Sequence, residues 1–289
     1  MKNTMKKPVN IPVEKLRPFA GHPFKVKDDE EMNTLIESVQ TQGILSPLIV
    51  RPIENTDEYE VISGHRRLHA AVKAGITEVP ALIYALERDS AAIAVVDSNL
   101  HREHILPSEK AFAYKLKMEA LSHQGKRTDL TSTQPVAKLR TGDIIGETLN
   151  ESRETVRRFI RLTHLIPELL DLMDEGKIAL MVGEALSYLG DEEQYAVLEE
   201  CEMNDCTPSY AQAVEMKKRF QDRQLSAYDI GEILSREKAN QKETIKIPSA
   251  RLAGKIPSGY TLQQKEDFIV KVVDYYNKYR ARQHDRDSR

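Results

Sequence analysis

Short apolar runs alternate with longer amphipathic segments along the first hundred residues. The runs predict strands, and segments with apolar residues every three or four positions predict helices. Met32, Leu35, Ile36 and Val39 show the helical spacing. The predicted order is a strand and entry turn at 10–16, a helix at 28–42, strands at 48–51 and 59–63, a helix at 64–74, a strand at 79–84 and a helix at 91–100.

From Leu106 onward the pattern is almost entirely helical. Ser108 is a predicted N-cap for a helix at 109–123, and the polar stretch 124–134 predicts a loop. The remaining expected elements are helices over 135–216, a charged helix or linker over 219–243, a short strand at 245–247 and an amphipathic helix at 262–282.

These elements predict an α+β N-terminal domain at 1–105 and an all-α domain at 106–216. A charged helix or linker at 217–244 leads to a C-terminal helical segment at 245–289. Apolar residues on the last helix suit it to dimerisation, although it could equally pack back on its own chain. They are Phe268, Val272, Tyr275, Tyr276 and Tyr279.

Composition favours a cytoplasmic protein without a membrane segment. Charged residues make up 30% of the chain, and no apolar run approaches the roughly 18 residues of a spanning helix. No apolar stretch follows the basic N-terminus, so a secretion signal is not expected. Cys201 and Cys206 have no nearby histidine to complete a zinc site, which indicates two reduced thiols.

The formal net charge of −3 excludes a protein that is polybasic overall. Affinity for nucleic acid would have to come from local basic patches. Two stretches qualify, one over 126–140 and one over 153–161. A solvated helix face is the alternative interpretation of each.

The segment 141–163 has the pattern of a helix-turn-helix. Its first helix, 143–149, contains Gly146 where the second helix would cross, and Asn150 suits the turn. Ser152 is placed to cap the second helix, the recognition helix, in which Val156, Phe159 and Ile160 would face inward. An ordinary helical hairpin is the alternative. The candidate DNA-binding residues are Ser152, Arg153, Thr155, Arg157, Arg158 and Arg161.

A second motif joins a strand to a helix through Gly64, followed by Arg66 and Arg67. Free N–H groups at a helix start bind anions, and an anion would offset the unfavourable placement of two arginines there. Phosphate fits best, and two surface arginines paired with acids are the alternative. His101 and His104 lack a third ligand, so a transition-metal site is not expected.

These motifs, in this order, resemble the ParB/RepB/Noc family of partition proteins over about residues 11–189. The resemblance includes the Gly-Ile-x-x-Pro-Leu-Ile-Val-Arg segment at 43–51, a Gly-Glu-Arg-Arg box matched by 64–67 and a Glu-Asn-x-Gln-Arg box matched by 98–102. The helix-turn-helix and an arginine- and leucine-rich helix ending in Ile166-Pro167 follow.

The resemblance implies CTP and Mg²⁺ as cofactors and double-stranded DNA as a partner. It implies a homodimer that loads at a palindromic site, closes as a clamp when CTP binds, and works with a ParA-type ATPase. Asn99 would serve Mg²⁺. The implied nucleotide-binding residues are Gly64, His65, Arg66, Arg67, Asn99 and Arg102.

Three positions depart from the family pattern. His65 and Ser98 stand where the family has glutamates, and His101 replaces a glutamine. Mg²⁺ prefers carboxylate oxygens, so these changes predict CTP binding with weak or absent hydrolysis. The ATPase-contacting N-terminal segment and the common chromosomal dimerisation domain are not recognisable, which indicates a divergent plasmid or integrative-element type.

Other functions share these features. A nucleoid-occlusion factor or a transcription regulator would carry the same DNA-binding residues, and any of the three would associate with the nucleoid or a plasmid. A nucleotide-dependent kinase or a nuclease on the same N-terminal fold is a further alternative. Sulfiredoxin chemistry is excluded, because no cysteine precedes Cys201.

Overall fold

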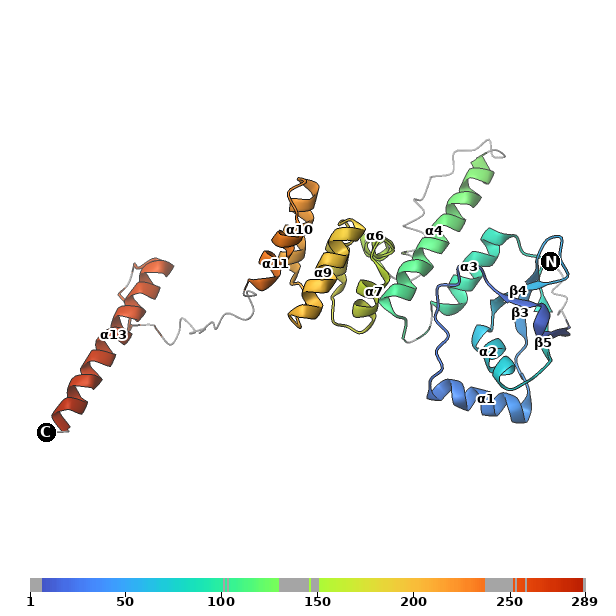
Figure 1. Cartoon of the computed structure of the whole chain (residues 1–289), viewed down its shortest axis with the longest axis horizontal. Helices are drawn as coiled ribbons and strands as arrows, with labels where there is room; N and C mark the ends of the chain where they lie inside the picture. Colours follow the sequence, from blue (N-terminus) through green and yellow to red (C-terminus); the bar gives the residue numbers. More distant parts are fainter. Residues whose placement is uncertain are drawn as a thin grey trace. The chain divides into compact units, whose positions relative to one another are not determined.

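A computed structural model describes residues 7–129 except 101 and 103, residue 146, residues 151–236, and residues 252–287 except 253 and 258. The chain divides into two compact units, Met1–Arg236 and Glu237–Arg289. In the first unit a sheet with three helices precedes a run of further helices, which confirms the predicted α+β then all-α order (Figure 1).

The N-terminal sheet is mixed and has the strand order β1-β5-β3-β4-β2. Pairing is antiparallel between β1 and β5 and between β3 and β4, and parallel between β3 and β5 and between β2 and β4. A short 3-10 helix separates β1 from β2 where we expected one strand and a turn. The strands are β1 (Val9–Pro12), β2 (Leu16–Pro18), β3 (Leu48–Pro52), β4 (Tyr59–Ser63) and β5 (Glu78–Ile83).

Three helices accompany the sheet: α1 (Glu30–Gln42), α2 (His65–Lys73) and α3 (Arg88–Asn99). Asp29 caps α1 by accepting a hydrogen bond from the backbone N–H of Met32, and Gly43 ends the helix with a φ of 69°. Met32 and Val39 are buried with strand residues such as Val50, as the spacing predicted.

Helix α4 runs from Pro107 to Asp129, so the predicted loop beginning at 124 is wrong over 124–129. Polar residues such as lysine and arginine are good helix formers, and a polar stretch alone does not end a helix. Ser108 is not the N-cap. Its backbone N–H and hydroxyl donate to the carboxylate of Asp174, 2.9 and 2.6 Å away.

The other helices of the first unit enclose a second core that includes Leu162, Leu169, Leu186, Met216 and Ile230. Helix α6 packs against α4 and α8, α8 against α10, and α9 against α11. The helices are α6 (Arg153–Leu162), α7 (Pro167–Asp174), α8 (Leu180–Leu186), α9 (Asp191–Met203), α10 (Tyr210–Gln221) and α11 (Ala227–Ser235).

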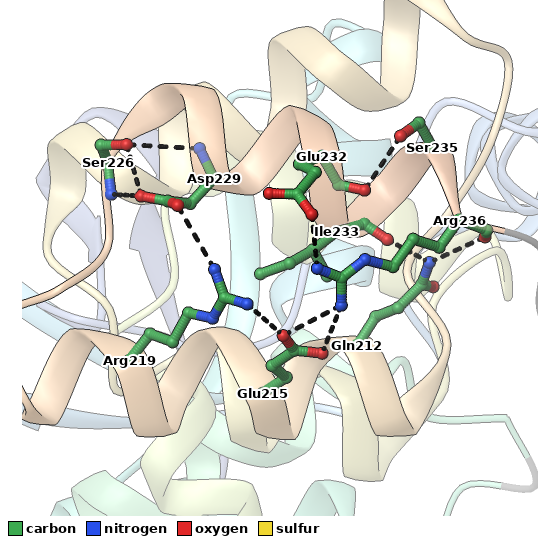
Figure 2. Close-up of polar contacts among 9 residues, drawn as sticks. All are labelled: Gln212, Glu215, Arg219, Ser226, Asp229, Glu232, Ile233, Ser235 and Arg236. Carbon is green, nitrogen blue, oxygen red and sulfur yellow. Dashed lines mark hydrogen bonds and ion pairs between the residues drawn. The ribbon is translucent and has the colours of Figure 1, made fainter.

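We expected a charged helix or linker at 217–244, and its described part, up to 236, packs against the helical core. Figure 2 shows the charges of α10 and α11 paired with one another. Arg219 lies 2.7 Å from Glu215 and 3.3 Å from Asp229, and Arg236 also contacts Glu215. The charged sequence here reflects ion pairs between two packed helices.

The second unit contains α13 (Leu262–Asp287). The predicted strand at 245–247 lies outside the described residues. Within the described parts of the chain, no helix is both long and apolar enough to cross a membrane.

Candidate functional site

The turn between β4 and α2 depends on Gly64. This residue has a φ of 104°, and an added Cβ would lie 3.1 Å from Cγ of Leu48 and 3.2 Å from the guanidinium of Arg67. Gly64 offers no side chain to cap α2. The first N–H groups of the helix therefore lack a capping partner, and with the helix dipole they can bind an anion.

The two arginines after this turn point to different partners. Arg66 is half-buried at the surface, with its guanidinium 3.1 Å from the Glu31 carboxylate and 3.9 Å from that of Asp29. This is the alternative that the sequence left open, a surface arginine paired with acids. Exposed pairs of this kind are weak, so Arg66 could exchange its carboxylates for a phosphate.

Arg67 is committed to the backbone. Its Nη1 donates to the carbonyl oxygens of Ser46 and, at 3.0 Å, Pro47. Burial lowers the pKa of its guanidinium. Arg67 therefore ties the segment before β3 to the first turn of α2, and a direct phosphate contact would require it to leave these carbonyls.

His65 points inward. Its Nε2 accepts a hydrogen bond from the backbone N–H of Phe19 at 3.4 Å, and its ring lies 3.7 Å from that of His22. Burial, followed by the nearby His22 and Arg102, lowers the pKa of His65 to about 3. His65 is thus a neutral, packed side chain.

A cavity of about 400 Å³ runs along α2 from this histidine pair. Ligand pockets have volumes of roughly 300–1,000 Å³ and mostly apolar linings. The cavity begins beside the first turn of α2 and can hold the apolar part of a ligand whose anionic part reaches Gly64. Its lining residues are Val13, Leu16, Pro18, His22, Val26, His65, Leu68, His69 and Val72.

The second predicted box lies close to the first. The guanidinium of Arg102 lies over the ring of Phe24, 5.4 Å from its centroid. Its charge contributes to the lowered pKa of His65, after burial and His22. The pKa of Arg102 is lowered by burial and, with the charge of Glu109 opposing, also by the charge of Arg66. The fold thus brings positive charge from both boxes into one region.

Asn99 is buried, and its amide nitrogen donates to the carbonyl of Val95 at 2.8 Å and to the hydroxyl of Ser98 at 3.2 Å. Only its side-chain oxygen is left for a cation. The described residues contain no group of three or more histidine, cysteine, aspartate or glutamate side chains placed to hold a metal ion. Mg²⁺ usually binds one or two protein groups together with substrate phosphates, so a Mg²⁺ ion at Asn99 would depend on the bound nucleotide.

The cap of the predicted recognition helix, α6, is confirmed. The Ser152 hydroxyl accepts a hydrogen bond from the backbone N–H of Thr155 at 3.0 Å, and the two hydroxyls lie 2.8 Å apart. Val156 is fully buried against Tyr114 of α4, with Phe159 and Ile160 partly buried beside them, as predicted.

The first helix of the predicted motif, 143–149, and the turn at Asn150 lie outside the described residues except for Gly146. Gly146 is buried, and an added Cβ would lie 2.6 Å from the carbonyl oxygen of Glu151. A residue without a Cβ is therefore needed at position 146, in agreement with the small residue that the sequence predicted there.

The arginines of α6 fall into two groups. Arg153 and Arg157 are exposed, and Arg157 has a long contact of 3.7 Å with Glu154. Arg158 lies within 3.9 Å of Glu154 and 3.7 Å of Glu184. Arg161 instead faces α8, where it donates to the carbonyl and hydroxyl of Ser187 at 2.7 and 3.2 Å.

Sequence reasoning missed the residues that hold the start of α6 in place. The Glu151 carboxylate accepts hydrogen bonds from the hydroxyl of Tyr114, 2.9 Å away, and from the ammonium of Lys110. Tyr114 is completely buried. Both partners come from α4, about forty positions earlier, so no local pattern could have identified them.

Comparisons with known proteins add a family relationship. Residues 1–100 match the family model of the ParB N-terminal domain. The chain is 33% identical over 193 residues to the chromosome-partitioning protein Spo0J of Thermus thermophilus, across 66% of this chain and 64% of that protein. It is 32% identical over 186 residues to the nucleoid occlusion protein of Geobacillus thermodenitrificans, across 64% and 59%. The chain thus spans less than two thirds of either relative.

Two crystal structures of C-terminally truncated ParB from Caulobacter crescentus are also similar. The structure complexed to the centromeric parS site is 22% identical and covers 78% of this chain and 98% of that one, with a TM-score of 0.41. The structure complexed with CTP-gamma-S is 25% identical and covers 67% and 97%, with a TM-score of 0.31.

Proposed function

Because the chain belongs to the ParB family through its N-terminal domain, we propose that it binds a specific duplex-DNA site and acts in plasmid or chromosome partition. The observation that carries this proposal is α6. Its serine-capped start and its exposed Arg153 and Arg157 form a surface of the kind that enters a major groove.

In this arrangement the first two turns of α6 approach the base edges. Arginine can donate two hydrogen bonds to guanine, and hydroxyl groups serve bases or phosphates. The residues that we assign to this surface are Ser152, Arg153, Thr155, Arg157 and Arg158, with Arg161 in a supporting position at its end.

The direct test is enrichment of bound duplexes from a randomised pool. We expect a two-fold symmetric sequence to emerge, because a protein dimer reads two related half-sites. Recovery of no preferred sequence, with the intact protein bound equally to all duplexes, would contradict site-specific binding.

We further propose that the N-terminal domain binds CTP. The phosphates of CTP would lie at the Gly64 turn, where Arg66 and Arg102 add positive charge. The nucleoside of CTP would occupy the adjoining apolar cavity. The support comes from the uncapped start of α2, the cavity and the family relationship. Arg67 would act by holding the turn in shape.

Hydrolysis of the nucleotide is expected to be weak or absent. His65 is neutral and packed inward, the Asn99 amide is bonded to its own helix, and no carboxylate occupies positions 65 or 98. Calorimetry with CTP, ATP and GTP, with and without duplex DNA, tests the binding. Equal affinity for all three nucleotides, or for none, would contradict a CTP site, and phosphate release measures turnover.

The same proposal includes a homodimer whose N-terminal domains close around DNA when CTP binds, and a ParA-type ATPase as partner. A cysteine pair engineered across the N-terminal domains should cross-link more readily with CTP. Cross-linking that CTP does not change would separate nucleotide binding from clamp closure.

A nucleoid-occlusion or regulatory role is the second candidate, and the resemblance to the Geobacillus protein favours it. Both roles use the same DNA-binding surface. A plasmid-loss assay distinguishes them, because only a partition protein should stabilise inheritance of a replicon that carries its site and its ATPase.

A further inference from the structure

Two cations from different helices lie against one aromatic ring at the far end of α6. Tyr188 follows α8. The guanidinium carbon of Arg161 lies 4.1 Å from its ring centroid, and the ammonium nitrogen of Lys217, on α10, lies 3.4 Å away. An aromatic ring attracts a cation and fixes its position, and here the ring gathers two.

Neither cation is neutralised by a carboxylate among the residues that the structure describes. The polar contacts of Arg161 go to the neutral hydroxyl and carbonyl of Ser187. Arg219, two positions beyond Lys217, is by contrast held between Glu215 and Asp229 (Figure 2). On α10, Arg219 is therefore paired with carboxylates, whereas Lys217 shares an aromatic ring with a second cation, Arg161.

This cation pair continues the arginine row of α6. Arg153, Arg157 and Arg161 are spaced four apart, so each is a neighbour of the next along the helix, and the last of them turns toward α8. Burial, and then the charges of Arg161 and Lys115, lower the pKa of the neighbouring His164. Positive charge from α4 and α6 thus reaches this end of the row.

We propose that Arg161, Tyr188 and Lys217 form a contact for the phosphate backbone of the duplex that flanks the base pairs read by α6; this rests on the proposed DNA-binding function. Two cations held on one aromatic ring repel one another, and a phosphate that contacts both would turn that repulsion into attraction. Tyr188 is a positioning residue that fixes both groups.

The site is suited to phosphate rather than to a base edge. Two of the five N–H donors of Arg161 are used on Ser187, which fixes the plane of the guanidinium and leaves the others available. Lysine acts as a point charge without the directed fork that reads guanine. A backbone contact of this kind adds affinity and sets orientation, and it carries no sequence information.

The experiment compares Lys217→Gln, Tyr188→Leu and the matched control Lys218→Gln in the full-length protein. Lys218 is the next residue on α10 and is exposed, so Lys218→Gln removes one positive charge close to that of Lys217 without touching the Tyr188 ring contact. The probes are the duplex enriched by the intact protein and a base-shuffled duplex of equal length. Fluorescence anisotropy measures the dissociation constant of each over a range of salt concentrations.

We expect Lys217→Gln to lower the slope of log affinity against log salt by about one, the value for one lost phosphate contact. The loss should be equal on both duplexes, so their affinity ratio should not change. Tyr188→Leu should have a similar effect, and Tyr188→Phe, which keeps the ring, should restore the slope relative to Tyr188→Leu. Lys218→Gln should leave it near the parental value.

The inference is overturned if Lys217→Gln leaves the slope of log affinity against log salt unchanged. It is also overturned if Lys218→Gln lowers this slope equally, because DNA would then respond to the net charge of α10 and not to a specific phosphate contact. If the parent prefers no duplex, the proposed site-specific function fails, and the shuffled duplex still tests the phosphate contact. If Arg157→Ala weakens binding to the enriched duplex while Lys217→Gln keeps the parental slope, only this inference fails. Thermal unfolding of each variant identifies any loss caused by misfolding.

Discussion

Gly64 meets two requirements of its turn, a positive φ and the absence of a Cβ. Its φ of 104° is strained for any residue with a side chain, and a Cβ there would contact the buried Leu48. We expect Gly64→Ala to lower the free energy of unfolding by about 2–3 kcal/mol and to weaken CTP binding. Urea unfolding and calorimetry measure the two effects.

Gly75 supplies the control. It has a φ of 73°, but an added Cβ would have no neighbour within 4 Å. Gly75→Ala should cost only the backbone strain, about 1–2 kcal/mol, and leave nucleotide affinity unchanged. Equal losses of stability and of affinity in both variants would show that Gly64 has no special role in the turn.

The half-buried His65 predicts a pH dependence of stability. Its pKa is lowered to about 3, mainly by burial, from an ordinary value of 6.5. The unfolded chain therefore takes up a proton that the folded chain refuses. The stabilisation is complete above pH 6.5 and is lost as the pH falls from there toward 3, by at most about 1.4 kcal/mol per pH unit.

Urea unfolding at several values in this pH range tests the prediction. His65→Gln should flatten the dependence, although the pKa of His22, which burial also lowers, will leave part of it. His123→Gln removes an exposed histidine and should leave the slope as it was. If His65→Gln keeps the parental change of unfolding free energy with pH, His65 is not the source of that dependence.

Residue types and local spacing were enough to predict the Gly64 turn, the Ser152 cap and the inward face of α6. They could not show that Arg67 bonds to Pro47 or that Arg161 bonds to Ser187. Those partners lie 20 and 26 positions away, and an arginine suits a phosphate and a backbone carbonyl equally well in sequence. The fold alone decides which acceptor it meets.

At the scale of elements, α6 is a short helix stabilised at its start by a capping serine and by the Glu151 contacts to α4. Its exposed arginines should therefore be removable without loss of fold. We expect Arg153→Ala or Arg157→Ala to weaken binding to the enriched duplex by about 1–3 kcal/mol and to reduce its preference over the shuffled duplex.

The control for this prediction is Lys177→Ala. Lys177 is exposed and pairs with Glu175 on the surface, 2.7 Å away. Its loss should have little effect on discrimination between the two duplexes. Specific binding that survives the Arg153/Arg157 double substitution would remove α6 from the major groove.

Element boundaries were less predictable than element types. The spacing of apolar residues predicted the start of the first helix at 28, and α1 begins two residues later, at Glu30, with Asp29 as its cap. Ser108 looked equally suitable, but Asp174 from α7 takes its hydrogen bonds, and the helix begins at Pro107. A cap depends on local chemistry only where no distant group competes for it.

At the scale of the whole molecule, the C-terminal helix α13 exposes several large apolar side chains to solvent, which is unfavourable for a helix without a packing partner. Val270, Val273, Tyr275 and Tyr276 each have at least half of their surface accessible to solvent. Exposed apolar groups of this density usually mark an interaction surface. A palindromic DNA site requires a two-fold protein, so a second copy of the helix is the partner that we expect.

Removing residues 261–289 tests this expectation. The full-length chain should be a dimer by light scattering at micromolar concentration, and the truncated chain should have half that mass. Affinity for the enriched duplex should fall, because two half-sites no longer bind as one unit, while α6 keeps its contacts within the first unit. A monomeric full-length chain would contradict the dimer and would favour packing of the helix on its own chain.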